Sequence, residues 1–257
     1  MNEFVKNSEA ENNTEYSIEV NNVRKFYRIY KDKGSQLRDK LLTMGRSKFH
    51  EHTVLDGVSL KIKRGEAVGF IGVNGCGKST LLKMLTRIIY PNSGTVTTYG
   101  RISGLIELGA GFHPDMTGRE NIYINASIYG LSRAEIDKKI EEIIDFSGIR
   151  EAIDNPVRTY SSGMYMRLGF AVAINVNADI LLVDEILAVG DAAFQAKCFD
   201  ALRTMKANGV TIVIVSHSLG QIEEICDKTY WIANGKLKME GEPKEVHAAY
   251  EHEVFGG

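Results

Sequence analysis

The segment Gly72–Ser79 carries the residue types and the spacing of a phosphate-binding loop. It reads GVNGCGKS, fits the pattern GxxxxGK(S/T), and lies between a short apolar run and a stretch with helical periodicity. In such a loop the glycines let backbone N–H groups close around β- and γ-phosphates, the lysine adds charge, and the final hydroxyl can bind Mg²⁺. We therefore predict a nucleotide site formed by Asn74, Gly75, Cys76, Gly77, Lys78, Ser79 and Thr80, with Lys78 catalytic and Ser79 a metal ligand.

The cysteine inside this loop, Cys76, carries a separate prediction. Backbone N–H groups and Lys78 would favour its thiolate, so we expect alkylation to block phosphate entry and bound nucleotide to protect. The alternative is a thiol too enclosed to react.

Two acidic residues end a buried strand further along the chain. Ile180–Glu185 reads ILLVDE, and a parallel strand of this kind delivers its C-terminal residues to the ligand edge of a sheet. Asp184 could hold Mg²⁺, directly or through water, and Glu185 could act as general base on an attacking water. The alternative is a strand that runs out into solvent with two ordinary surface acids.

His217 and Tyr160–Met164 are further candidates for the site. His217 follows the apolar run VTIVIV, so its imidazole could reach a γ-phosphate and the attacking water, although a lone histidine is more often structural. Tyr160–Met164 reads YSSGM and heads a helical stretch, with Ser161 as an N-cap candidate and exposed N–H groups beyond it. The alternative for Ser161 is a plain helix cap.

The elements that must position these residues alternate between strands and helices. Strand, helix and strand at this spacing indicate parallel strands with crossover helices. Asn234-Gly235 predicts a hairpin, and Ser132–Glu135 has the pattern of a capping box. Strands are predicted over 16–23, 54–63, 66–72, 95–100, 102–108, 178–185 and 209–217, and helices over 81–89, 192–209 and 243–254.

Composition and charge are those of an ordinary globular protein. The 257 residues are 44% hydrophobic and 25% charged, and the net charge of −2 gives no global basic field that would point to nucleic acid. Three scattered cysteines give neither a disulfide framework nor a zinc site. No apolar run approaches the roughly 18 residues of a membrane span. We expect residues 1–15 to form a disordered acidic tail that is not a signal peptide.

Taken in this order, the motifs resemble those of the ATP-binding cassette (ABC) family over nearly the whole of residues 16–240. The resemblance implies an α/β fold, a P-loop NTPase nucleotide-binding domain with a RecA-like mixed sheet core. An antiparallel β subdomain and a helical signature subdomain, at about residues 112–174, complete the implied fold. It implies a single domain over 16–257 without a C-terminal carbohydrate-binding domain, and ATP and Mg²⁺ as cofactors.

Each motif of the family has a counterpart in this sequence. Gly72–Thr80 corresponds to Walker A, Tyr160–Met164 to the signature and Ile180–Asp184 to Walker B. The usual signature reads LSGGQ; Ser161 and Gly163 match it, which implies contact with the γ-phosphate held by a second copy of the chain. The resemblance also implies that Glu185 is the catalytic glutamate, that Asp191 is the D-loop aspartate and that His217 is the switch histidine. The Q-loop position, which senses Mg²⁺, falls near Glu107. Tyr27 would stack on adenine, with Phe26 and Tyr30 as alternatives.

Several segments resemble one subfamily, the ATP-binding subunits of bacterial exporters of O-antigen, teichoic acid and related polysaccharides. These segments read YSSGM, LIELGAGFHP, LAVGDAAFQAKC and TGRENIY. The resemblance implies an ATPase peripheral to the cytoplasmic face of a bacterial inner or plasma membrane. The implied partners are two copies of a polytopic membrane subunit, a second copy of this chain in an ATP-sandwich homodimer, and a polyprenyl-diphosphate-linked polysaccharide reached through the membrane subunit, with no nucleic acid.

Three other functions match parts of the sequence. An exporter ATPase for a drug, lipid or other cargo is disfavoured by the YSSGM and ELGAGFHP segments. A soluble ABC ATPase acting on DNA or ribosomes usually has two cassettes, a long coiled coil or zinc-binding cysteines, which this sequence does not show. A non-hydrolysing ATP-binding adaptor is disfavoured because Glu185 and His217 are both present.

A basic insertion occupies about residues 28–53, where most cassettes reach the next strand within a few residues. Residues 24–48 hold nine Lys or Arg and two Asp, a local charge of +7. Leu37, Leu41 and Met44 recur at helical spacing and predict a short amphipathic helix. This helix could pack on the cassette with a solvated basic face, or lie at the cytoplasmic mouth of the membrane partner near anionic headgroups or the lipid-linked diphosphate.

Overall fold

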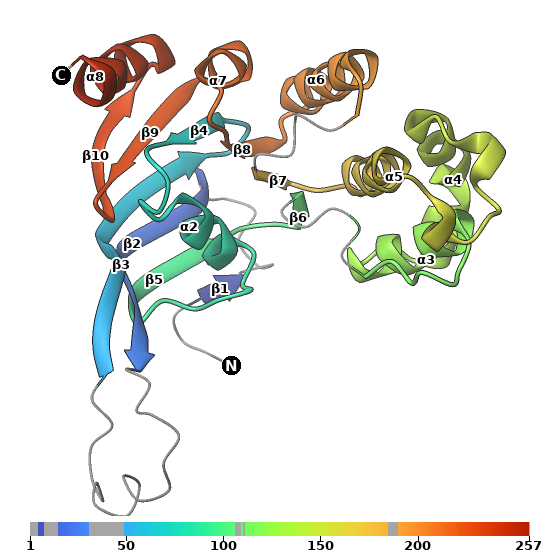
Figure 1. Ribbon diagram of the computed structural model, residues 1–257, viewed down its shortest axis with the longest axis horizontal. Coiled ribbons are helices and arrows are strands. Elements are labelled where there is room, and N and C mark those ends of the chain that lie inside the picture. Colours follow the sequence, from blue (N-terminus) through green and yellow to red (C-terminus); the bar gives the residue numbers. More distant parts are fainter. Residues whose placement is uncertain are drawn as a thin grey trace, which may run out of the picture.

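The computed structural model describes residues 5–7, 15–30, 49–105, 109, 111–184 and 190–256. Two sheets and their flanking helices form most of the molecule, and a group of three helices lies together at one side (Figure 1). This combination of elements confirms the predicted α/β class.

A six-stranded mixed sheet forms the centre of the fold. Its strand order is β10-β9-β4-β8-β7-β6, and every neighbouring pair is parallel except β9 and β10. All residues of β4 and β8 are buried, as expected for strands of a parallel sheet that is covered on both faces. The strands are β4 (Ala67–Ile71), β6 (Ile102–Leu105), β7 (Ile180–Asp184), β8 (Thr211–Val215), β9 (Lys228–Ala233) and β10 (Lys236–Gly241).

A four-stranded sheet packs beside it, in the order β1-β5-β2-β3. Strand β2 (Tyr16–Tyr30) is antiparallel to β3 (Phe49–Lys63) and to β5 (Ser93–Thr98), whereas β1 (Val5–Asn7) is parallel to β5. Strands β2 and β3 both run further than the sequence predicts. The added residues, 24–30 and 49–53, form a ribbon that leaves the body of the molecule (Figure 1). The amphipathic helix predicted around Leu41 lies outside the described residues.

Three helices, α3 (Gly118–Ile128), α4 (Arg133–Ser147) and α5 (Ser162–Asn175), pack around a core of their own within the predicted helical region. Helices α3 and α4 both begin with a capping box, and the predicted box at Ser132 is therefore confirmed. Two short 3-10 helices, η1 (Arg150–Ala152) and η2 (Val157–Thr159), lie between α4 and α5.

The remaining helices flank the central sheet. They are α2 (Lys78–Leu85), α6 (Ala192–Ala207), α7 (Leu219–Ile225) and α8 (Pro243–Phe255). Helix α2 begins directly at Lys78 and ends before the predicted residue 89, because Arg87 has a positive φ of 62° that a helix does not accept. The Arg87 guanidinium donates to the hydroxyl of the buried Thr98 at 3.2 Å.

The hairpin between β9 and β10 turns at Asn234-Gly235, as the sequence predicts. Both residues have positive φ, 50° and 73°, which the tight turn requires. Gly235 also has no room for a side chain, since a Cβ would lie 2.5 Å from the carbonyl oxygen of Val54. Its own carbonyl accepts the N–H of Asp56 at 2.8 Å, so the hairpin ties the central sheet to β3.

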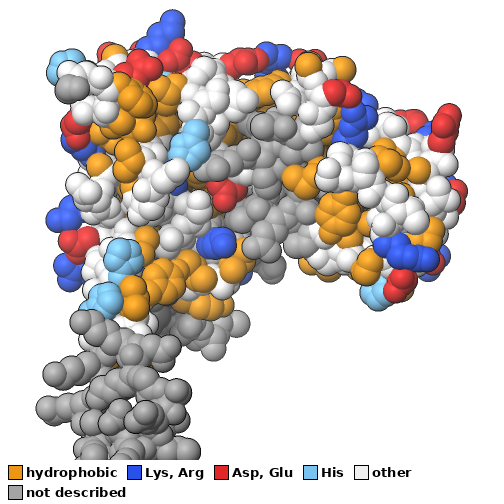
Figure 2. Space-filling model, viewed as in Figure 1, with side chains coloured by type: hydrophobic (Ala, Val, Ile, Leu, Met, Phe, Trp, Pro, Cys, Tyr) orange, Lys and Arg blue, Asp and Glu red, His pale blue; other side chains and the backbone are white. Residues whose placement is uncertain are grey.

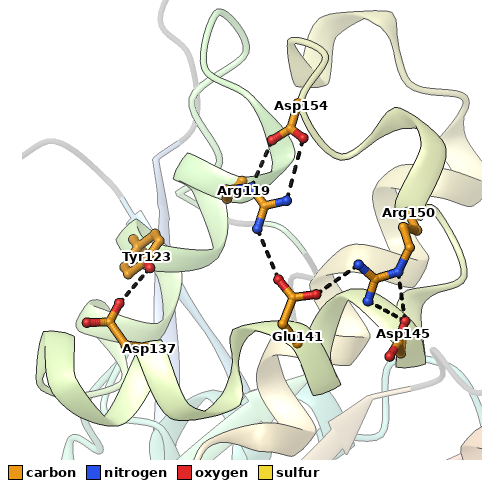
Figure 3. Close-up of polar contacts among 7 residues, drawn as sticks. All are labelled: Arg119, Tyr123, Asp137, Glu141, Asp145, Arg150 and Asp154. Carbon is orange, nitrogen blue, oxygen red and sulfur yellow. Dashed lines mark hydrogen bonds and ion pairs between the residues drawn. The ribbon is translucent and has the colours of Figure 1, made fainter.

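Five charged side chains form a chain of ion pairs on the surface of the helical group (Figure 3). Arg119 donates to Asp154 at 2.8 Å and to Glu141 at 3.4 Å, and Arg150 donates to Glu141 at 2.8 Å and to Asp145 at 2.5 Å. The hydrogen bond from Arg150 holds the pKa of Glu141 below its ordinary value, and the one from Arg119 does the same for Asp154. These pairs join α3, α4 and the segment that follows them.

We expect this chain of ion pairs to stabilise the protein at neutral pH and not in acid. A carboxyl whose pKa is lowered by folding contributes above its ordinary pKa, and the contribution is lost as the pH falls through the lowered value. Glu141→Gln should therefore lower the Tm at neutral pH and have little effect in acid. Glu142→Gln, a neighbour outside the chain of ion pairs, is the control, and thermal unfolding followed by circular dichroism checks both. An equal loss of Tm at the two pH values would contradict the electrostatic origin.

Candidate nucleotide site

The phosphate-binding loop lies at the carboxyl edge of the central sheet. It follows β4, which is buried between β8 and β9, and it ends where α2 begins at Lys78. Gly77 is the N-cap residue of α2, with φ 113°, and the first turn of the helix has no acidic residue. The N-terminus of α2, whose dipole favours an anion, therefore closes the loop.

The three glycines of the loop are required for different reasons. A Cβ on Gly72 would lie 2.2 Å from the carbonyl oxygen of Ile232, and a Cβ on Gly77 would lie 2.5 Å from Cδ2 of Leu55. Gly75 has φ 79°, but nothing lies within 4 Å of the place of its Cβ. Gly72 and Gly77 thus pack the loop against its neighbours, while Gly75 leaves an open approach on the ligand side.

Lys78 is the charged residue of the loop and is only 5% exposed. Its Nζ donates to the carbonyl oxygens of Gly72 at 2.7 Å and Val73 at 3.2 Å, and it lies 3.9 Å from Sγ of Cys76. The ammonium is therefore held inside the loop, at the place where the sequence predicts bound phosphates. A pocket of about 280 Å³ opens here, lined by His52, Val54, Asn74, Gly75, Gly77, Lys78, Ser79 and Thr80.

Cys76 lies beneath the loop and not at its mouth. The residue is 5% exposed, and its Sγ is packed close to Gly72, since a Cβ there would lie 2.7 Å from the sulfur. The structure favours the alternative of an enclosed thiol over the predicted reactive one.

Two other predicted residues lie at the same carboxyl edge of the sheet. Asp184 is the last residue of β7 and pairs with Val215 of β8, the strand next to β4. His217 follows β8 by two residues and is exposed. The order β4-β8-β7 therefore places the loop, the histidine and the carboxylate on adjacent strand ends, as ligand sites of parallel sheets require. Glu185 and Glu107 lie outside the described residues.

The predicted signature residues lie at the start of α5. Ser161 is the N-cap, and its Oγ accepts the N–H of Met164 at 3.2 Å, which confirms the predicted cap. Gly163 lies in the first turn, where the atom nearest to the place of a Cβ is the Ser161 hydroxyl oxygen at 3.9 Å. Helix α5 belongs to the helical group, on the other side of the molecule from the ribbon and away from α2 (Figure 1). Within one chain, the helix that Ser161 caps therefore lies apart from the helix that begins at Lys78.

Asp191 joins the signature helix to α6. Its carboxylate caps α6 by accepting the N–H of Phe194 at 2.9 Å, and it accepts a hydrogen bond from Arg167 of α5 at 2.5 Å. The N–H of Phe194 and the Arg167 guanidinium hold the pKa of Asp191 below its ordinary value. The same guanidinium lies 5.0 Å from the ring centre of Phe194. An ion pair thus links the second turn of α5 to the N-terminus of α6.

The three candidate aromatic residues differ in position on the ribbon. Tyr27 is 42% exposed and pairs with His52, a residue that lines the pocket of the loop. Phe26 is half-buried, and Tyr30 is 59% exposed at the far end of the ribbon. Figure 2 shows hydrophobic and histidine side chains gathered where the ribbon leaves the body of the molecule. Only Tyr27 of these three is placed directly opposite a residue of the pocket.

His52 and Val54 line the pocket without having been predicted. They lie two residues apart on β3, and both side chains line the pocket. The two-residue separation of His52 and Val54 is the sequence signal that could have indicated them. The alternation of apolar and polar residues, however, predicts a strand only from residue 54 onward.

A comparison with protein families decides the assignment: residues 55–188 match the family described as ABC transporter. The chain belongs to the ABC transporter family. The matched region contains the loop Gly72–Ser79, the predicted signature residues and Asp184.

Curated ABC proteins similar to this chain cover nearly all of it. The chain is 46% identical over 237 residues to the O-antigen export system ATP-binding protein RfbB of Klebsiella pneumoniae, covering 91% of this chain and 96% of that protein. It is 45% identical over 235 residues to the teichoic acids export ATP-binding protein TagH of Levilactobacillus brevis, covering 91% of this chain and 64% of that protein.

A solved ABC structure confirms the fold. It is a dimeric structure of a post-hydrolysis state of the ATP-binding cassette MJ0796 bound to ADP and Pi, with a TM-score of 0.69 and 21% identity over 88% of this chain and 98% of that one. Across the described part of this ABC chain, no helix has the length and apolar character needed to cross a membrane.

Proposed function

We propose that this protein hydrolyses ATP to power the export of a polyprenyl-diphosphate-linked polysaccharide across the cytoplasmic membrane. The observation that carries the proposal is its identity of 45–46%, over nine-tenths of the chain, to proteins named for O-antigen and teichoic acid export. The phosphate-binding loop, which this chain builds at the carboxyl edge of the central sheet, supports the ATPase activity.

In this proposal the loop binds the phosphates of ATP. The backbone from Asn74 to Thr80 surrounds them, and the ammonium of Lys78 turns from the carbonyl oxygens of the loop to the phosphate oxygens. Tyr27 stacks on adenine, which its exposed ring and its place opposite His52 support. The pocket of about 280 Å³ beside the loop is the proposed place of the phosphates.

The oxygen ligands near the loop fit Mg²⁺, which prefers hydroxyl and carboxylate oxygens. The Ser79 hydroxyl lines the pocket, and the Asp184 carboxylate ends an adjacent strand of the sheet. Glu107 is proposed as a third metal contact. When bound, Mg²⁺ would supply positive charge to the phosphate groups. Glu185 takes the proton of the attacking water, and His217 holds that water and the γ-phosphate.

The site is completed by a second copy of the chain. Ser161 and Gly163 of one copy contact the γ-phosphate held by Lys78 of the other, and Asp191 lies at the same interface. The position of α5, away from α2 of its own chain, supports this arrangement (Figure 1). The first turn of α5, with Ser161 as its cap and no acidic residue, suits an incoming phosphate.

The membrane partner is proposed to be a polytopic subunit present in two copies. The dimer of this chain would bind it at the cytoplasmic face, and the polysaccharide would pass through the membrane subunits. The export systems named in the two relatives support this assembly.

Removing the gene in its own bacterium tests the proposal. We expect loss of one surface polysaccharide and accumulation of its lipid-linked form inside the cell, with recovery by the wild-type gene but not by Lys78→Ala. Glu142→Gln, far from the loop on α4, is the control that should restore export. If surface polysaccharide is unchanged in the deletion strain, the exporter carries another substrate. Phosphate release by Lys78→Ala at the wild-type rate would contradict the assignment of this loop as the ATPase site.

A further inference from the structure

A β-bulge brings strand β3 onto the phosphate-binding loop. Lys25 of β2 pairs with Leu55, but the next residue, Phe26, pairs with Thr53, so Val54 is the extra residue on β3. Leu55 is fully buried and packs against Gly77 of the loop. Bulges bend a strand and re-aim its side chains, and this one directs β3 along the wall of the pocket.

Beyond the bulge, His52 is the polar residue of β3 that lines the pocket. Tyr27 pairs with it across the ladder, and His50 pairs with Ile29 one step further along the ribbon. His50 and His52 lie on the same face of β3, since they are two residues apart. Only His52 of these two is among the described residues that line the pocket.

The ring of Tyr27 is held in place by its neighbours. The Lys25 ammonium lies 5.1 Å from the ring centre and donates to the carbonyl oxygen of Tyr90 at 2.7 Å. Burial lowers the pKa of Lys25. This contact fixes one side of the ring and leaves the rest of it exposed. The ring is therefore a positioned surface for a base, with His52 directly beside it.

We propose that His52 binds the ribose of the nucleotide through a hydrogen bond between its imidazole and a ribose hydroxyl. The inference rests on the proposed function, in which Tyr27 stacks on the base and the loop binds the phosphates. In a nucleotide the ribose joins these two parts, and His52 both pairs with Tyr27 and lines the pocket of the loop. A histidine ring can donate to or accept from a hydroxyl, which suits a sugar contact.

The test compares three ligands on the purified wild-type protein and on two variants. The ligands are ATP, 2′,3′-dideoxy-ATP and inorganic tripolyphosphate, and isothermal titration calorimetry gives the Kd of each. We expect the wild-type protein to prefer ATP over the dideoxy analogue by about 2–10-fold, the usual value of one hydrogen bond. His52→Ala should lose this preference and keep its affinity for tripolyphosphate. His50→Ala is the matched control and should keep both.

Several results would overturn the inference. One is a preference for ATP that persists in His52→Ala, and another is a wild-type protein that binds ATP and the dideoxy analogue equally well. A third is a loss of tripolyphosphate affinity in His52→Ala, which would show that the histidine contacts the phosphates instead of the ribose. Thermal unfolding of each variant verifies that the fold is intact. A wild-type protein that binds no ATP would instead overturn the proposed function, so the two failures are distinguishable.

Discussion

Glu185→Gln is expected to bind ATP with nearly wild-type affinity while its rate of hydrolysis falls about 10²–10⁴-fold, the typical cost of losing a general base. The phosphate contacts that we propose for Lys78 and Ser79 come from the loop and the start of α2, which a substitution at residue 185 leaves unchanged. Glutamine has the same shape as glutamate but cannot take a proton from water. Because ATP is no longer consumed, the two-chain form should accumulate.

Phosphate release and size-exclusion chromatography with ATP measure these two effects. Lys78→Ala is the informative comparison, because it should lose both binding and the ATP-dependent dimer. Hydrolysis by Glu185→Gln at close to the wild-type rate would place the general base at another residue.

Gly72→Ala is expected to destabilise the protein and to abolish ATP binding. The φ of Gly72 is 145°, and a Cβ there would lie 2.2 Å from the carbonyl oxygen of Ile232 and 2.7 Å from Sγ of Cys76. That oxygen belongs to β9, which pairs with β4, so it cannot move without disturbing the central sheet. Backbone strain and overpacking each cost about 1–3 kcal/mol of folding free energy.

Urea unfolding and ATP titration check this prediction. Gly220→Ala is the matched control, because Gly220 lies in α7 with nothing within 4 Å of the place of its Cβ. That control should keep its stability or gain up to about 1 kcal/mol from the better helix propensity of alanine. Wild-type stability and ATP affinity in Gly72→Ala would contradict the packing argument.

The features that follow from local residue patterns could be predicted from the sequence. Strands β4 and β8 are continuous apolar runs because both faces of the sheet are covered. The capping boxes and the Asn234-Gly235 turn depend only on neighbouring residues, and the structure confirms the predicted ones. The loop itself combines a motif with a buried strand and a helix, which is why its location was predictable.

The remaining features depend on contacts between distant residues. The ends of β2 and β3 form a ribbon with exposure on both faces, so their sequence lacks the alternation of a half-buried strand. The choice of Tyr27 over Phe26 and Tyr30 depends on the register of that ribbon. His52 reaches the pocket because of a bulge at Val54, and no residue of β3 by itself indicates a bulge.

The position of β4 between β8 and β9 sets the order in which the protein can fold during synthesis. The loop leaves the ribosome early, but both strands that hold β4, and the carbonyl of Ile232 that packs on Gly72, belong to the C-terminal part of the chain. The nucleotide site therefore assembles only once the β9–β10 hairpin has emerged. Until β8 has emerged, the apolar β4 has no partner strand in the central sheet, and until β9 has emerged, ATP has no formed site through which to stabilise the growing chain. Such non-local pairing slows folding and leaves apolar strands exposed to aggregation until their partners emerge.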